Sequence, residues 1–225
     1  MNQFGIVAPT PPAIEIEHPA HGREYLTAVV LGLPFGGTSM VAGTVAALGI
    51  PLATSAEYEF CYEASEFNNQ SLEQVSASIA GWNEKHSVWG FKDPHAKRHD
   101  AVEFHASLRN PHYIIVCKDI ASMTARLVQD PIRHDDGGAP LDRLQYEVAE
   151  HGAFLPWVLT LPLAPKLLVS YHAAIRRPQQ FCESVAEFLH LDVTFETLVK
   201  AVNRISEQGG YLVKENTGAP ECPTT

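Results

Sequence analysis

Three largely apolar runs of strand length constrain the fold of this chain more than any other feature. They lie at 25–31 (YLTAVVL), 112–118 (HYIIVCK) and 166–172 (KLLVSYH), and a shorter candidate lies at 88–92 (VWGFK). A continuous apolar run indicates a strand that is buried on both faces, which is typical of a parallel sheet covered by helices. Helical patterns separate the runs, so the sequence predicts a three-layer α/β fold. We expect a mainly parallel sheet of about four or five strands.

The segments between these runs predict the domain organisation. Proline-rich residues 1–22 are expected to form an irregular arm, 23–212 a single domain and 213–225 a frayed tail. Helices are expected near 40–49, in two segments within 57–85, and at 99–108, 121–130, 141–161, 178–189 and 195–205. Pro156 predicts a kink or a break in the longest of them, and 131–140 (PIRHDDGGAP) predicts a loop.

Charge and composition exclude several classes of protein. Asp and Glu outnumber Lys and Arg by 26 to 16, and the net charge of -10 argues against nucleic acid or an anionic membrane as partner. No apolar run approaches the roughly 18 residues of a membrane span, and the N-terminus lacks the pattern of a secretory signal. The cysteines form no CxxC pair, and Cys117 and Cys182 are expected to be buried, reduced thiols. A cytoplasmic protein is therefore expected.

The turn after the first predicted strand is the strongest indication of function. Residues 32–39 (GLPFGGTS) have the outline G-x4-G-x-S and lie between a buried strand and a helix. Such glycines let backbone N–H groups face an anion, and the helix N-terminus adds the positive end of its dipole. We expect a phosphate-binding loop; the alternative is a tight structural turn. Thr38 stands where a Walker A loop has lysine, which argues against the rival interpretation of a P-loop nucleotide or metabolite kinase.

Four segments, in this order, resemble the P-loop sulfotransferases. LGLPFGGTSMVAGTVAALGI is similar to their 5′-phosphosulfate loop, WGFKDP at 89–94 to their W-G-x-K-D-P segment, and HYIIVCKDIASMTARL to the strand and helix that bind the 3′-phosphate. KLLVSYHAAIRRPQQFCESVAEFLHL resembles their late strand, turn and helix, so the resemblance covers most of 25–191. It implies a P-loop NTPase-like fold and transfer of a sulfuryl group from 3′-phosphoadenosine-5′-phosphosulfate (PAPS), as co-substrate, to a hydroxyl or amine. The acceptor would be a small molecule or a glycan, a homodimer is compatible with the family, and no metal is required.

The resemblance also implies a donor site, from which this chain departs in places. The expected donor-binding residues are Phe35, Gly36, Gly37, Thr38, Ser39, Lys118 and Arg126. Residues 36–39 would hold the 5′-phosphosulfate, and Lys118 with Arg126 the 3′-phosphate. Phe35 stands where the family has Arg or Lys, Lys118 where it has Arg, Arg126 near the position of a serine, and His172 where it has glutamate. These departures predict a slow or donor-altered enzyme, or a non-catalytic relative in which Phe35 fills the donor pocket. A further alternative is that Phe35 packs into the core beneath the loop.

The acids after the first predicted helix include the candidate general base. They are Glu57, Glu59, Glu63 and Glu66. Because 62–67 (YEASEF) resembles an E-x-x-x-F stretch of the family, Glu63 is the first candidate for removing the acceptor's proton. The alternative is a solvated helix face that carries carboxylates.

A lysine and two histidines follow the short strand candidate. Lys92 is expected to offset charge on the leaving group, or to form a plain ion pair with Asp93 or a neighbour. His95 and His99 are alternative bases. Their spacing of four would also suit zinc, but the sequence offers no third ligand at a telling position.

Overall fold

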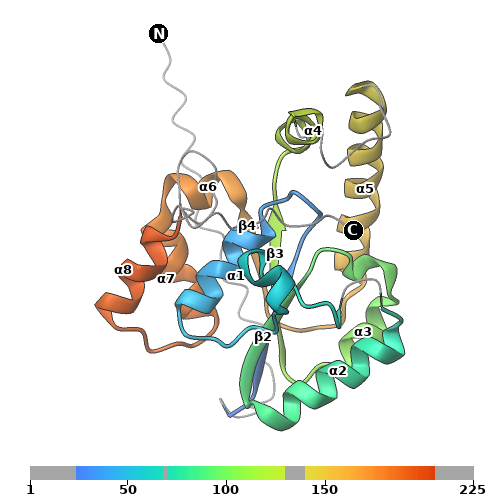
Figure 1. The fold of residues 1–225 in the computed structure, drawn as a ribbon. Helices are drawn as coiled ribbons and strands as arrows, with labels where there is room; N and C mark the ends of the chain where they lie inside the picture. The colour runs from blue at the N-terminus through green and yellow to red at the C-terminus, as the bar shows by residue number, and fades with distance from the viewer. Residues whose placement is uncertain (1–23, 68–69, 130–139, 206–225) are drawn as a thin grey trace.

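The computed structural model of the protein describes residues 24–67, 70–129 and 140–205 (Figure 1). The predicted arm (1–22) and tail (213–225) lie outside these residues, as do 131–139 of the predicted loop. The assignment of 23–212 to a single domain stays a prediction.

A parallel sheet forms the centre of the molecule. Its strands are β1 (Leu26–Leu31), β2 (Val88–Asp93), β3 (Pro111–Cys117) and β4 (Lys166–Ser170). In the described residues the sheet has four strands in the order β2-β1-β3-β4, and every neighbouring pair is parallel. The predicted α/β class and number of strands are confirmed. Because β1 lies between β2 and β3, the segments that follow these three strands meet at one edge of the sheet.

Helices cover both faces of the sheet and complete the three layers (Figure 1). Their bounds are α1 Thr38–Ala47, η1 Ala56–Cys61, α2 Leu72–Lys85, η2 Ala96–Arg98, α3 Ala101–Ala106, α4 Ile120–Gln129, α5 Pro140–Thr160, α6 Tyr171–Arg176, α7 Pro178–Phe188 and α8 Phe195–Asn203. Side chains of β1 alternate between two cores: Ala28 and Val30 pack with α1, α7 and α8, and Val29 and Leu31 with α2, α3 and α5. The alternation follows from the two-residue period of a strand.

Hydrogen bonds of polar side chains define where several elements begin. The α2 helix starts with a capping box, in which Ser71 and Gln74 each accept a hydrogen bond from the other's backbone N–H. The Asp100 side chain accepts from the backbone N–H groups of Val102 and Glu103 and starts α3. The Ser170 hydroxyl accepts from Ala173 N and starts α6, so the strand predicted at 166–172 ends two residues early.

A further expectation about burial was wrong, and one of the two alternatives predicted at Pro156 is excluded. The last strand was expected to be buried on both faces, yet Leu168 is 62% exposed; β4 is one of the two edge strands of the sheet, and it lacks the burial that the other edge strand, β2, has. A break was a predicted alternative at Pro156, but α5 continues to Thr160. Phe154 and Val158, on either side of the proline, are buried in the core below the helix, and this packing outweighs the backbone hydrogen bond that proline removes.

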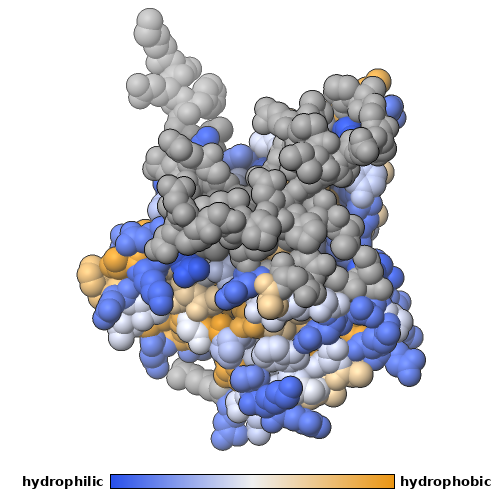
Figure 2. Space-filling view, viewed as in Figure 1, coloured by the Kyte–Doolittle hydropathy of each residue, from blue (hydrophilic) through white to orange (hydrophobic). Residues whose placement is uncertain are grey.

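The cysteines and the surface complete this description. Cys117 and Cys182 are free thiols, as predicted; Cys182 is buried but Cys117 only half-buried, and burial raises the pKa of both. Cys61 is disulfide-bonded, which the sequence did not predict. Hydrophilic side chains occupy much of the face in Figure 2, and apolar surface appears around α8, where Phe195 is exposed. Across the described residues, none of the helices has the length and apolar character needed to cross a membrane. A cytoplasmic location stays a prediction.

Candidate active site at the carboxyl edge of the sheet

The loop after β1 has a turn that places unusual demands on Phe35. Gly36 N donates to Leu33 O at 2.9 Å, and Pro34 and Phe35 are the two residues between them. Phe35 has a φ of 61°, in the left-handed region that a turn of this kind normally gives to glycine or asparagine. For a bulky residue this conformation costs on the order of 1–2 kcal/mol. The residue is half-buried and is not part of either buried core, which does not support the expectation that Phe35 packs beneath the loop.

The helix that follows the loop presents its N-terminus at the same edge. Gly37 is the N-cap residue of α1 with a φ of 90°, no side chain caps the helix, and its first turn holds no acidic residue. The first N–H groups of a helix have no partner within it, and they carry the positive end of the helix dipole. Thr38 and Ser39, in this first turn, are only 4% and 7% exposed. This arrangement suits an anion, as the loop sequence predicted.

Lys92 forms the centre of the site. It lies in β2 next to the end of that strand, its side chain is 2% exposed, and its Nζ lies 2.6 Å from Glu63 Oε1 and donates to Ser39 Oγ at 3.0 Å. Burial lowers the pKa of Lys92, while the Glu63 carboxylate and, less strongly, Asp93 act in the opposite direction. The ion pair expected for this lysine is therefore made with Glu63, which follows η1. One ammonium group thus joins the first turn of α1 to the first candidate base.

Asp93, the last residue of β2, organises the turn beyond it. The residue is 1% exposed, Oδ1 accepts from His95 N at 2.8 Å, and Oδ2 lies 3.7 Å from Arg98 Nη2. Burial raises the pKa of Asp93 to about 6, against the opposing effect of Arg98. The carboxyl group thereby fixes the backbone that carries His95.

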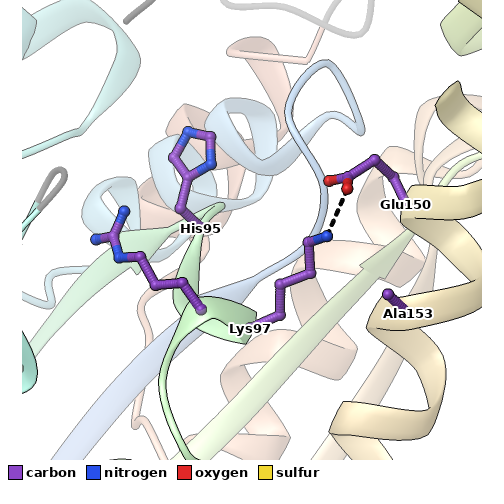
Figure 3. A pocket seen from close by; sticks show the side chains of 5 residues that line it. His95, Lys97, Glu150 and Ala153 are labelled. Carbon is purple, nitrogen blue, oxygen red and sulfur yellow. Dashed lines mark hydrogen bonds and ion pairs between the residues drawn. The ribbon is translucent and has the colours of Figure 1, made fainter.

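A pocket of about 340 Å³ opens beside this turn, between η2 and α5 (Figure 3). Its lining residues are His95, Lys97, Arg98, Glu150 and Ala153, and Lys97 Nζ pairs with Glu150 Oε1 at 2.6 Å across it. Burial and the charge of Arg98 lower the pKa of His95, which favours a neutral imidazole that can accept a proton. His95 is tied to the end of β2 by the hydrogen bond from its N–H to Asp93, the residue after Lys92. The pocket therefore adjoins the site.

His99 belongs to the core rather than to this pocket. It is 8% exposed, its ring stacks on Phe104, and its Nε2 lies 3.2 Å from Arg98 Nε, which donates to it. His95 and His99 lie at the two ends of η2. In the part of the chain that the structure describes, no three His, Cys, Asp or Glu side chains are grouped to hold a metal ion.

The predicted 3′-phosphate residues are placed unequally. Lys118 follows β3, its Nζ donates to Phe35 O at 3.3 Å, and it lies 4.8 Å from the centroid of the Tyr171 ring. Its ammonium therefore lies at the loop that follows β1. Arg126 lies in α4, and its side chain is outside what the structure describes.

Two features of this edge were not predicted. Tyr171 was not a predicted site residue, but its ring packs so closely against Gly37 that a Cβ added there would lie 2.1 Å from it. The tyrosine that follows an apolar strand is the signal that could have suggested this contact. His172 Nε2 lies 2.6 Å from Asp119 Oδ2 and joins α6 to the segment before α4. Hydrogen bonds from Ser122, and then His172, lower the pKa of Asp119 to about 2.

Comparison with known proteins concerns the fold. No family model and no curated protein matches the sequence. The structure is similar to the sulfotransferase domain from the curacin biosynthetic pathway, with a TM-score of 0.55 and 13% identity over 80% of this chain and 78% of that one. The chain has a sulfotransferase-type fold. A sulfotransferase domain from the Synechococcus PCC 7002 olefin synthase matches with a TM-score of 0.43 and 15% identity over 82% of this chain and 80% of that one.

Proposed function

We propose that the protein is a sulfotransferase that moves a sulfuryl group from PAPS to a hydroxyl or amine of a small-molecule or glycan acceptor. The observation that carries this proposal is the position of Lys92, whose buried ammonium lies between Ser39 of the phosphate loop and the Glu63 carboxylate. A cation in that position can offset charge on a leaving phosphate while a neighbouring carboxylate receives a proton. The sulfotransferase-type fold supports the same reaction.

The donor's 5′ end would lie at the N-terminus of α1. The backbone N–H groups of Thr38 and Ser39, in the uncapped first turn of α1, could donate hydrogen bonds to an anion there without the lysine of a Walker A loop. Lys92 lies on the β2 side of the loop. This arrangement favours a phosphosulfate over the β- and γ-phosphates and Mg²⁺ of a kinase substrate, which need that lysine.

Transfer would proceed in line between two bound groups. The acceptor oxygen or nitrogen forms a bond to sulfur as the bond from sulfur to the bridging oxygen of the donor breaks. The acceptor's proton passes to Glu63 or His95, and Lys92 offsets the charge that develops on the bridging oxygen. Most of the rate enhancement would come from positioning and electrostatics. The pocket beside His95 is where we place the acceptor.

The two candidate bases can be separated by matched substitutions. Glu63→Gln keeps size and polarity but accepts no proton, so turnover should fall by roughly 10²–10⁴ if Glu63 is the base. His95→Gln should then have the smaller effect. A larger loss in His95→Gln than in Glu63→Gln would assign the base to His95.

Calorimetry with three ligands tests the function itself. We expect adenosine 3′,5′-bisphosphate and PAPS to bind and ATP–Mg²⁺ to bind weakly or not at all. Binding of ATP–Mg²⁺ alone would favour a kinase, and binding of none would favour a non-catalytic relative. Transfer of a radiolabelled sulfuryl group to a panel of hydroxyl and amine acceptors then tests the reaction. Lys92→Met should abolish transfer, and Lys85→Met, on the exposed end of α2, is the matched control.

A further inference from the structure

We infer that Lys118 supplies the cation that the phosphate loop itself lacks, and that its ammonium binds the 5′-phosphosulfate rather than the 3′-phosphate of the nucleotide. The inference rests on the proposed function, because the ligand is the same donor. It moves Lys118 from the 3′-phosphate to the 5′-phosphosulfate of the donor. A loop that has Phe35 in place of a cation could then still hold a doubly charged group.

The sheet order brings Lys118 to the loop. β3 is a direct neighbour of β1, with Leu31 opposite Ile115, so the residue that follows β3 lies beside the loop that follows β1. The contact is explicit, because Lys118 Nζ donates to Phe35 O at 3.3 Å. A residue that binds the far end of an extended nucleotide would need its ammonium directed away from this loop.

Two further contacts hold the lysine in this position. Its Nζ lies 4.8 Å from the centroid of the Tyr171 ring, which itself packs on Gly37 at the N-cap of α1. Its backbone carbonyl lies 3.2 Å from His151 Nε2, which comes from α5. Tyr171 is 5% exposed, so the aromatic face under the ammonium is a fixed surface rather than a mobile one. The position of Lys118 is therefore set by α6 and α5 as well as by the loop.

The charge balance of the site favours the same role. Lys92 lies on the β2 side of the loop, and its charge is balanced by Glu63 at 2.6 Å. A phosphosulfate brings two negative charges to the helix N-terminus. Lys118 approaches that position from the β3 side, so an anion on the loop would lie between the two lysines. A charge-assisted hydrogen bond is among the strongest contacts that the chain could offer there.

The test compares ligands that carry or lack each terminal group. Lys118→Met keeps the aliphatic stem against Tyr171 but removes the charge, and Lys118→Arg keeps the charge. Calorimetry would measure adenosine 5′-phosphosulfate, adenosine 3′,5′-bisphosphate, adenosine 3′-phosphate and inorganic pyrophosphate. We expect Lys118→Met to weaken all ligands with a 5′ anionic group, and pyrophosphate, by about tenfold or more, and adenosine 3′-phosphate by less than twofold. Lys118→Arg should retain most of the affinity.

Lys166→Met is the matched control. Lys166 also donates to backbone carbonyls, those of Leu161 and Pro162, and also lies over a tyrosine ring, but it begins β4 at the opposite edge of the sheet. It should leave every affinity unchanged. Thermal unfolding of each variant shows whether the fold is intact.

The outcomes separate this inference from the proposed function. A loss confined to the 3′-phosphorylated ligands, or no loss for any ligand, would overturn the inference and leave the sulfotransferase proposal standing. Wild-type protein that binds pyrophosphate but none of the nucleotides would overturn the proposed function. A tenfold loss of pyrophosphate affinity in Lys118→Met would in that case still support the role of Lys118 at the loop.

Discussion

Glu63→Gln should destabilise the protein far more than Lys92→Met, because the two partners of this ion pair are buried unequally. The side chain of Lys92 is 2% exposed and that of Glu63 17% exposed. Removing the carboxylate leaves a charged ammonium in a site that water scarcely reaches. Removing the ammonium leaves a carboxylate that water can still reach in part. The asymmetry is a direct consequence of the position of each group.

The expected loss of stability follows from the distance between the Lys92 and Glu63 charges and from the burial of each side chain. Opposite charges 2.6 Å apart attract by about 6 kcal/mol at an effective dielectric constant of 20, before desolvation is subtracted. Losing one partner of a buried pair typically costs about 3–5 kcal/mol. Glutamine can still accept a hydrogen bond, and Lys92 keeps Ser39 as a partner. We therefore expect a loss of about 2–4 kcal/mol in Glu63→Gln and at most about 1–2 kcal/mol in Lys92→Met.

Urea unfolding of both single variants and the double variant measures these losses in the free energy of unfolding. In thermal unfolding, Glu63→Gln should lower the Tm of a domain of this size by roughly 4–16 °C. The double variant should be no less stable than Lys92→Met, because the buried charge is gone in both. A cost below about 1 kcal/mol in Glu63→Gln, or a coupling energy below about 0.5 kcal/mol in the cycle, would refute the reasoning.

Three further predictions concern the same edge of the sheet. The pKa of Asp93 is raised from 3.8 to about 6, so this carboxyl group binds its proton more tightly in the folded than in the unfolded state. Up to about 3 kcal/mol of the free energy of unfolding should therefore be lost as the pH rises from about 4 to about 6. Asp93→Asn should lack that loss when urea unfolding is measured across this pH range. Gly37→Ala should lower the free energy of unfolding in urea by about 2–4 kcal/mol, because Gly37 has a positive φ and its added Cβ would meet a tyrosine ring. Gly81→Ala, in open space on α2, is the control and should raise that free energy by about 0.5–1 kcal/mol. Phe35→Arg keeps the same backbone cost and adds a cation, so donor binding should tighten by about 1–3 kcal/mol in calorimetry, and a destabilised variant that does not bind would contradict this.

The fold was predictable because its signals are local. The runs at 25–31 and 112–118 are mostly apolar, and the corresponding strands are buried along nearly their whole length. The run at 166–172 looks the same in the sequence, but its position at the edge of the sheet depends on strand order. Apolar composition cannot distinguish a central strand from an edge strand when the neighbours are unknown.

The candidate site was predictable as a set of residues but not as a set of contacts. Glu63 and Lys92 were both named, but the expected partner of Lys92 was a neighbour such as Asp93, which is adjacent in the sequence. Successive residues of a strand point to opposite faces, so Lys92 and Asp93 diverge, whereas Glu63 reaches Lys92 from a segment that precedes the strand by a whole helix. The pairing required knowledge of how η1 and β2 are packed.

The order of the strands also explains how the loop can lack its own cation. A parallel sheet brings every strand's carboxyl end to one edge, so a charge lost from the loop after β1 can be replaced from the end of β2 or of β3. Phe35 and Lys118 are 83 positions apart, yet a hydrogen bond joins them. On this inference the substitution of Phe35→Arg should tighten the donor more in a Lys118→Met background than in the wild type, because one cation then takes over what the other supplied. Equal gains in the two backgrounds would show that the two positions act on different parts of the ligand.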